Sequence, residues 1–184
     1  MIVGIDEVGR GCWAGPLVAG AVVLGAPIAG LKDSKKLSKK QREILDAEIR
    51  ISALGYGLGW VTPAELDQVG LTEAVRLAME RALAGIKQTY TELIVDGNFN
   101  FFPKNPLATA LVGADNIVPA VSAASIIAKV ARDKYMADAA TTFPGYAFEK
   151  HVGYGTAAHA SALQNLGVCK LHRRSFKPIQ ACIA

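Results

Sequence analysis

Short apolar runs alternate along this chain with longer segments in which apolar residues recur at helical spacing. The runs 2–6 and 17–24 are separated by a short glycine-rich segment, so we predict that they form two antiparallel strands. Further strands are predicted at 92–95 and 107–112, and the run 51–61 is extended but less regular. Strands that alternate with helices predict an α/β fold with a mixed central sheet flanked by helices.

Helices are expected at three places between these strands. Ser38 and Gln41 have the spacing of a capping box and predict the start of a helix. Helical spacing of apolar residues predicts a second helix over 71–86, and a long third helix is expected over about 122–141. From about 143 the chain is richer in glycine, histidine and basic residues, so we expect a C-terminal segment of short helices and loops.

Length and composition exclude several classes of protein. With 184 residues, 51% of them hydrophobic, and no linker or repeat, we predict one globular domain over 1–184. The three cysteines are far apart and lack zinc-ligand spacing, which argues against a disulfide scaffold or a zinc site. No apolar run approaches the roughly 20 residues of a membrane-spanning helix. We therefore expect a cytoplasmic protein that does not enter a membrane, and a monomer.

Basic residues are concentrated in two segments of the chain. The net charge is only +4, but six lysines and arginines lie between 32 and 42, and four lie between 170 and 177. Clusters of this kind bind the phosphates of a polyanion with an affinity that depends on salt. A solvated helix face is the alternative interpretation of either cluster.

Two aspartates share one sequence context. Asp6 and Asp96 each end an apolar strand and are each followed by a glycine within three residues. Strand ends in an α/β sheet are where functional sites form. Because side chains on a strand alternate between its faces, Asp6 and the adjacent Glu7 can face one site only if the strand stops between them. The glycines that follow favour such a stop.

A further candidate acid lies in the long predicted helix. Asp133 shares a polar stripe with Ser125 and Lys129, opposite the apolar side of the helix. The alternative is a surface ion pair of Asp133 with Lys129 or Arg132. If the acids converge, they suit Mg²⁺ or Mn²⁺, which prefer oxygen ligands, and two such ions could bind one phosphodiester, as a nuclease requires.

Five segments in order resemble the signature of bacterial ribonuclease HII, the type 2 ribonuclease H. They cover nearly the whole chain, and the ordered set is far more specific than any single member. The segments are Gly4-Ile5-Asp6-Glu7-Val8-Gly9-Arg10-Gly11 with Ala14-Gly15-Pro16, Asp33-Ser34-Lys35-Lys36-Leu37, Val95-Asp96-Gly97, Ala123-Ala124-Ser125-Ile126-Ile127-Ala128-Lys129-Val130 with Arg132-Asp133, and His172-Arg173-Arg174-Ser175-Phe176.

The resemblance implies a ribonuclease H-like fold and an endonuclease that hydrolyses the RNA strand of RNA/DNA hybrids. It also implies incision 5′ of ribonucleotides embedded in duplex DNA, with 3′-hydroxyl and 5′-phosphate products. The family's metal ligands correspond to Asp6, Glu7, Asp96 and Asp133, and two Mg²⁺ or Mn²⁺ ions are expected with substrate. Asp115 matches another acidic position of the family, but we do not count it among the ligands.

The resemblance also assigns residues to substrate binding. In the family, a glycine-rich loop contacts the ribose 2′-hydroxyl, the group that distinguishes RNA from DNA. A tyrosine stacks on the sugar of the next deoxynucleotide, and two lysines would hold the phosphate backbone. The corresponding residues here are Gly9, Arg10 and Gly11 for the loop, Tyr154 for the tyrosine, and Lys35 and Lys36 for the lysines. The segment of about 143–184 is thus expected on the substrate side.

The chain departs from the family pattern at two positions, each of which removes a cation near the expected substrate path. Gly113 and Val152 stand where the family usually has lysine. We predict that Val152→Lys tightens hybrid binding, because it restores a phosphate contact. Binding measured over a salt titration checks this, and an unchanged affinity would contradict it.

Three alternatives compete with the type 2 assignment. A type 3 ribonuclease H has an additional N-terminal substrate-binding domain and lacks the G-R-G arrangement, so type 2 is favoured. The second alternative is a catalytically silent nucleic-acid-binding module, and the third is a nuclease of related fold that cuts DNA branches. The residues 179–184 lack paired aromatics, so a sliding-clamp interaction through the tail is not expected.

Overall fold

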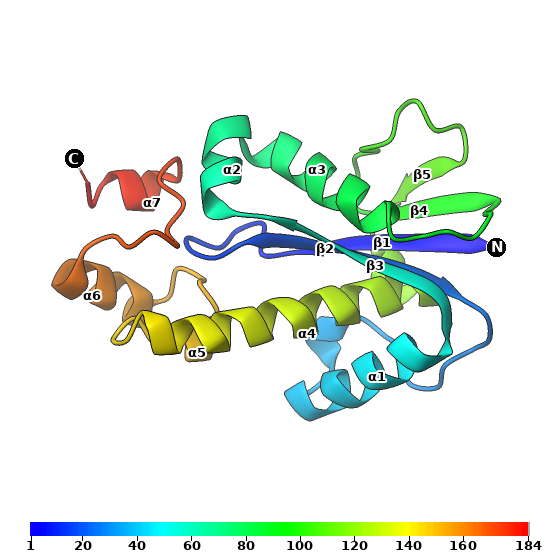
Figure 1. Ribbon diagram of the computed structural model, residues 1–184, viewed down its shortest axis with the longest axis horizontal. Coiled ribbons are helices and arrows are strands. Elements are labelled where there is room, and N and C mark those ends of the chain that lie inside the picture. Colours follow the sequence, from blue (N-terminus) through cyan, green and yellow to red (C-terminus); the bar gives the residue numbers. More distant parts are fainter. Residues whose placement is uncertain (184) are drawn as a thin grey trace.

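The computed structural model describes residues 1–183 as a five-stranded mixed sheet with helices on both faces (Figure 1). The strand order is β3-β2-β1-β4-β5. Strand β1 pairs antiparallel with β2 and parallel with β4, which confirms the predicted hairpin and mixed sheet. The strands are β1 (Ile2–Val8), β2 (Leu17–Leu24), β3 (Ala53–Val61), β4 (Glu92–Asp96) and β5 (Ala108–Leu111).

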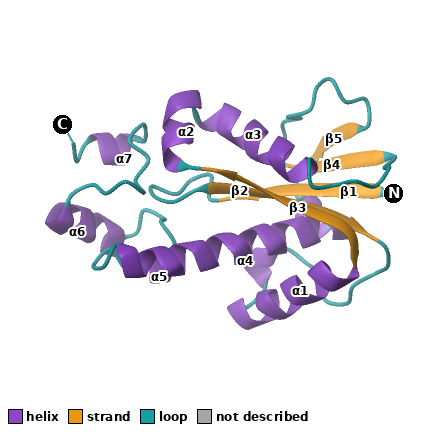
Figure 2. Ribbon diagram, viewed as in Figure 1, coloured by secondary structure: helices purple, strands orange, loops and turns teal. Residues whose placement is uncertain are grey.

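Helices cover the sheet from two sides (Figure 2). Helices α2 and α3 lie over one face, and α4 with α1 lies over the other. The short helices α5, α6 and α7 lie beyond one end of the sheet. The helices are α1 (Lys39–Ser52), α2 (Pro63–Val69), α3 (Leu71–Leu83), α4 (Pro119–Thr142), α5 (Phe148–His151), α6 (Ala157–Leu166) and α7 (Lys177–Gln180), with the 3-10 turns η1 (Ser34–Lys36) and η2 (Ala114–Asn116).

The predicted capping box is present at the start of α1. The Ser38 hydroxyl accepts from the Gln41 N–H, and the Gln41 side chain accepts from the Ser38 N–H. Helix α3 ends at Leu83, three residues before the predicted end, and α4 begins at Pro119, three residues before the predicted start. A proline at the first position suits a helix start, because its missing N–H would have no partner there. No helix within residues 1–183 is long and apolar enough to cross a membrane.

Helix α4 lies very close to the sheet because two glycines face it. A Cβ added at Gly4 or at Gly20 would overlap the backbone of α4 at Ala120 or Ala124. Gly4 and Asp6 are two residues apart on β1, and therefore they lie on the same face of the sheet. The close approach thus brings the side chain of Asp6 directly against α4.

Candidate active site

Three carboxylates from distant parts of the chain meet at one end of the sheet. Asp6 lies on β1, Asp96 is the last residue of β4, and Asp115 lies in η2 after β5. One carboxylate oxygen from each lies within 4.8 Å of those of the other two. The parallel pairing of β1 and β4 explains this, because parallel strands bring their carboxyl ends to the same edge.

Burial raises the free-energy cost of negative charge on two of these carboxylates. Asp6 is 7% exposed and Asp115 is 4% exposed. Burial, and then the charge of Glu7, raises the pKa of Asp6 to about 8. Burial, and then the charges of Asp96 and Asp33, raises the pKa of Asp115. Oδ1 of Asp96 is buried and accepts no hydrogen bond from the described residues. A hard divalent cation is the partner that such oxygens suit.

Glu7 lines the same cavity as Asp6, but not for the reason we expected. The predicted end of the strand between these residues is wrong, because β1 continues to Val8. The pairing of β1 with β4 ends at Ile5, so β4 does not cover the edge of β1 at Asp6 and Glu7. Side chains from both faces of the strand can therefore reach the cavity at this edge. Burial raises the pKa of Glu7, and the guanidinium of Arg10, 3.6 Å away, opposes that rise.

The cavity also collects most of the residues expected to contact substrate. It has a volume of about 470 Å³. Ser34 and Ser125, whose hydroxyls lie 3.0 Å apart, join η1 to α4 at its wall. The lining residues are Asp6, Glu7, Val8, Gly9, Arg10, Gly11, Ser34, Lys35, Asp96, Ser125, Lys129 and Tyr154.

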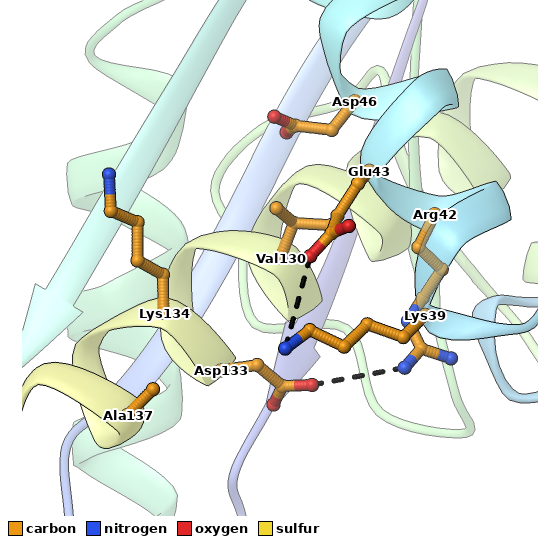
Figure 3. Close-up of a pocket in the computed structure, with 8 residues that line it drawn as sticks. All are labelled: Lys39, Arg42, Glu43, Asp46, Val130, Asp133, Lys134 and Ala137. Atoms are coloured by element: carbon orange, nitrogen blue, oxygen red, sulfur yellow. Dashed lines mark ion pairs between the residues drawn. The ribbon is translucent and has the colours of Figure 1, made fainter. Parts of the chain in front are cut away.

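Asp133 lies outside the group of three carboxylates. Nζ of Lys129 donates to Oδ1 of Asp133 over 2.8 Å, as the ion-pair alternative anticipated, and Nη2 of Arg42 lies 3.9 Å from Oδ2. Figure 3 shows Asp133 directed toward Arg42 in a neighbouring cavity between α1 and α4. Lys129 also lines the cavity that contains Asp6 and Asp96. Its side chain therefore lies between that cavity and the one that contains Asp133.

The sequence contained a signal for Asp115 that we did not use. Asp115 follows a predicted strand and a glycine, and the end of a strand is the context that identified Asp6 and Asp96. The structure brings Asp6, Glu7 and Asp96 together as expected, and it adds Asp115 to them.

Two buried arginines hold the loop that contains Gly9, Arg10 and Gly11. Arg132 is fully buried and donates to the carbonyls of Ala14, Pro16 and Val152. Its side chain fills the space where a Cβ of Gly9 would lie, and Gly9 has a φ of +88° that favours glycine. The loop is therefore held in one conformation from its inner side.

Arg173 supports the same loop from the C-terminal segment. It is fully buried and donates to the carbonyls of Gly15 and Arg10, while burial lowers its pKa to about 10. The next two residues, Arg174 and Ser175, donate from their backbone N–H groups to the carboxylate of Asp67.

The remaining predicted contacts have different surroundings. Tyr154 is 42% exposed, and Nζ of Lys129 lies 6.0 Å from the centre of its ring. Lys35 lines the cavity, whereas Lys36 is exposed and donates to Oδ1 of Asn116. Tyr154, Lys129 and Lys35 thus add an aromatic face and two amines to the cavity that contains the carboxylates.

The two departures from the family pattern both have left-handed backbone. Gly113 has a φ of +70° and precedes η2, and Val152 has a φ of +45° and packs against the cluster of α5 and α6. Left-handed backbone disfavours a β-branched residue, so the conformation of Val152 is imposed by its surroundings, including the hydrogen bond from Arg132.

The chain is similar to known proteins both in sequence and in structure. A family model described as Ribonuclease HII matches residues 3–179. Ribonuclease HII of Halorhodospira halophila is 48% identical over 181 residues, which cover 97% of this chain and 93% of that protein. The crystal structure of ribonuclease H2 from Pyrococcus horikoshii OT3 matches with a TM-score of 0.84 and 27% identity over 98% of this chain and 96% of that one. Ribonuclease HII of Archaeoglobus fulgidus, solved in complex with PCNA, matches with a TM-score of 0.82 and 28% identity over 96% of this chain and 95% of that one.

Proposed function

Because the chain belongs to the ribonuclease HII family and is a ribonuclease H endonuclease, we propose that it also incises duplex DNA 5′ of an embedded ribonucleotide. The products would carry a 3′-hydroxyl and a 5′-phosphate. The observation that supports this proposal is one cavity lined both by acidic residues and by Gly9, Arg10, Gly11 and Tyr154. A cleavage site and a ribose-reading loop would then contact the same nucleotide junction.

We propose that the cleavage reaction uses two Mg²⁺ or Mn²⁺ ions. The residues fit such ions because Asp96 Oδ1 has no hydrogen-bond partner among the described residues and because three carboxylates share a narrow space. Asp6, Glu7, Asp96 and Asp115 would hold the ions, with Asp115 in the role that the resemblance assigned to Asp133. Two bound ions supply an activated water and stabilise the leaving oxygen of a phosphodiester.

The side chains around the carboxylates have separate tasks in this proposal. Asp6 must give up its proton before it can act as an anionic ligand, since its pKa is about 8. Lys129 is held by Asp133 at the cavity wall, where its ammonium would attract a phosphate oxygen. Lys35 and Lys36 would contact the phosphate backbone farther out.

Recognition of the ribonucleotide would come from the loop and from Tyr154. A glycine backbone can approach a sugar closely because no Cβ intervenes, and nothing within 4 Å surrounds the Cβ position of Gly11. The half-exposed ring of Tyr154 would stack on the sugar of the next deoxynucleotide. The C-terminal segment of about 143–184 would thus form the substrate side of the enzyme.

Cleavage of three matched duplexes tests this function. The duplexes are all-DNA, RNA/DNA hybrid, and DNA with one ribonucleotide, each with Mg²⁺ or Mn²⁺ and then with chelator. We expect the last two duplexes to be cut only with metal, and the single-ribonucleotide duplex to be cut on the 5′ side of the ribonucleotide. Cutting with chelator would contradict the metal proposal. Binding without cutting would favour a silent module. A branched all-DNA junction is included as a fourth substrate, and cutting of this junction alone would favour a branch nuclease.

Tyr154→Ala should raise the KM for the single-ribonucleotide duplex by about tenfold, because the variant loses the contact between the ring and the sugar. Tenfold corresponds to about 1.4 kcal/mol, at the lower end of the roughly 1–3 kcal/mol that an aromatic ring contributes when it stacks on a base. Steady-state kinetics on that duplex measure the effect. Tyr56→Ala is a matched control, since Tyr56 is 38% exposed on β3 and does not line the cavity. Equal KM values for the two variants would argue against a role of Tyr154 in binding.

A further inference from the structure

All three histidines of the chain form one buried cluster next to the backbone of Tyr154. His151, His159 and His172 are 8%, 0% and 2% exposed. The rings of His151 and His159 are stacked with centres 4.4 Å apart, and the centres of His159 and His172 lie 5.2 Å apart. Phe148 packs against all three rings. Such burial of every histidine calls for a reason beyond filling space, because each ring carries two polar atoms.

Hydrogen bonds specify the tautomers of two of these rings when both are neutral. Nδ1 of His159 lies 2.9 Å from the carbonyl oxygen of Tyr154, which can only accept, so the proton of His159 is on Nδ1. Nε2 of His159 is then an acceptor, and Nε2 of His172, 3.0 Å away, donates to it. Nδ1 of His172 therefore accepts from the N–H of Cys169 over 3.0 Å, although the carbonyl oxygen of Cys169 also lies 3.3 Å from this nitrogen. We call this series from Cys169 to Tyr154 the histidine relay.

The third ring has an equally defined state. Nδ1 of His151 accepts from the N–H of Gly153 over 3.2 Å, and its Nε2 therefore donates to the carbonyl of Tyr146 over 2.7 Å. Every ring nitrogen of the cluster thus has a partner when all three histidines are neutral, with one tautomer for each ring.

The relay ends on the backbone that presents Tyr154. The carbonyl of Tyr154 also accepts from the N–H of Thr156, and the N–H of Tyr154 donates to the carbonyl of His151. At the other end, His172 forms a bridge with Ala14, which lies in the loop that begins at Gly9. The relay therefore lies between the two elements proposed to read the substrate, the glycine loop and Tyr154.

We propose that His159 and His172 are positioning residues that hold Tyr154 over the cavity through the histidine relay. The proposal rests on the proposed function, because it assumes that Tyr154 binds the substrate. Neither histidine lines the cavity, so neither is expected to touch the nucleic acid.

A proton added to either ring would change the relay. Protonated His159 would direct an N–H at Nε2 of His172, and His172 would then have to move its own proton to Nδ1, where the carbonyl oxygen of Cys169 lies 3.3 Å away. The titratable groups around the rings are His151, Tyr146, Cys169 and Tyr154, and in residues 1–183 no carboxylate forms an ion pair or a hydrogen bond with either ring.

The resulting pH dependence has a definite sign. Burial lowers the pKa of His159, and burial together with the charge of His159 lowers the pKa of His172 to about 4. The unfolded chain, with histidine pKa values near 6.5, binds more protons than the folded one between about pH 4 and 6.5. The contribution of these histidines to the free energy of unfolding is therefore complete above about pH 6.5, and it decreases as the pH falls toward about 4.

The tautomers can be tested directly in the full-length protein. Long-range ¹H–¹⁵N spectra with labelled histidine distinguish protonated Nδ1 from protonated Nε2. At pH 7 we expect His159 to be protonated on Nδ1 and both His151 and His172 on Nε2. Any other tautomer of His159 or His172 at that pH would overturn the relay.

The link to Tyr154 is tested by a double-mutant cycle on the single-ribonucleotide duplex. His159→Phe keeps an aromatic ring and removes both hydrogen bonds, so we expect KM to rise by about tenfold with little change in kcat. In the Tyr154→Ala background the same substitution should change KM by less than about twofold, because the residue it positions is absent. Independent, multiplicative effects would overturn the proposal.

Conservative replacement separates the hydrogen bond from packing. The amide of His172→Gln can still donate to His159, whereas His172→Leu cannot. We expect the Gln variant to stay within about threefold of the wild-type KM and the Leu variant to resemble His159→Phe. Equal KM values for the Gln and Leu variants would overturn the relay even if one variant melts at a lower temperature. If Tyr154→Ala by itself leaves KM unchanged, the role of Tyr154 in the proposed function fails, and the spectra still report on the relay.

Discussion

Asp6→Asn and Asp96→Asn are each expected to lower kcat by on the order of 10³-fold, since each removes one anionic oxygen of the carboxylate group. Binding of the RNA/DNA hybrid should persist, because asparagine keeps the shape of the side chain and adds no negative charge near the phosphates. Single-turnover cleavage and hybrid binding, measured on the same preparations, check the two statements. Near-normal cleavage by either variant would contradict its assignment as a ligand.

The same Asp6→Asn variant should be more stable than the wild type when metal is absent. The pKa of Asp6 is about 8 in the folded protein and near 3.8 in the unfolded chain, so the folded state retains a proton that the unfolded chain has released. The stability contributed by that proton is complete below about pH 3.8 and is lost as the pH rises toward 8. Asparagine is uncharged at every pH, so the variant does not lose this stability as the pH rises.

Thermal melting with chelator at pH 5 and pH 8 measures this effect. We expect the difference in Tm between variant and wild type to grow by several degrees from pH 5 to pH 8, at roughly 2–4 °C per kcal/mol for a chain of this size. Added Mg²⁺ should raise the Tm of the wild type more than that of the variant. A difference that shrinks as the pH rises would show that burial does not penalise the Asp6 carboxylate.

Asp115→Asn should reduce cleavage by about 10²–10³-fold, and Asp133→Asn should reduce it much less. The carboxylate of Asp115 lies with those of Asp6 and Asp96, whereas that of Asp133 is neutralised by Lys129. Metal titrations by calorimetry should show weaker Mn²⁺ binding for Asp115→Asn only.

The two variants are matched controls for each other, because each exchanges one aspartate beside the cavities for its neutral isostere. The resemblance to the family pointed to Asp133 as the fourth ligand, and the grouping of carboxylates favours Asp115. Greater loss of Mn²⁺ affinity in Asp133→Asn would reverse this preference and restore the original assignment.

Local chemistry explains why much of the fold was predictable. The capping box at Ser38, the hairpin of β1 and β2, and the helical spacing that predicts α3 each depend on residues close together in the sequence. Ends of elements were less predictable, as the strand that continues through Glu7 shows. Whether that strand stops depends on its hydrogen-bonded neighbours, β2 on one edge and β4 on the other, which no local pattern specifies.

Patterns in the amino-acid sequence were enough to establish the α/β class, the family and the set of acids from which a metal site could be built. Which acids lie together became clear only from the folded chain, in which Asp115 lies beside Asp6 and Asp133 pairs with Lys129. The same holds for the three histidines, which folding encloses in one cluster. The physical reason is that hydrogen-bond patterns and helical periodicity act over a few residues, whereas the interaction between charges and the cost of burial depend on distances that exist only after the chain has folded.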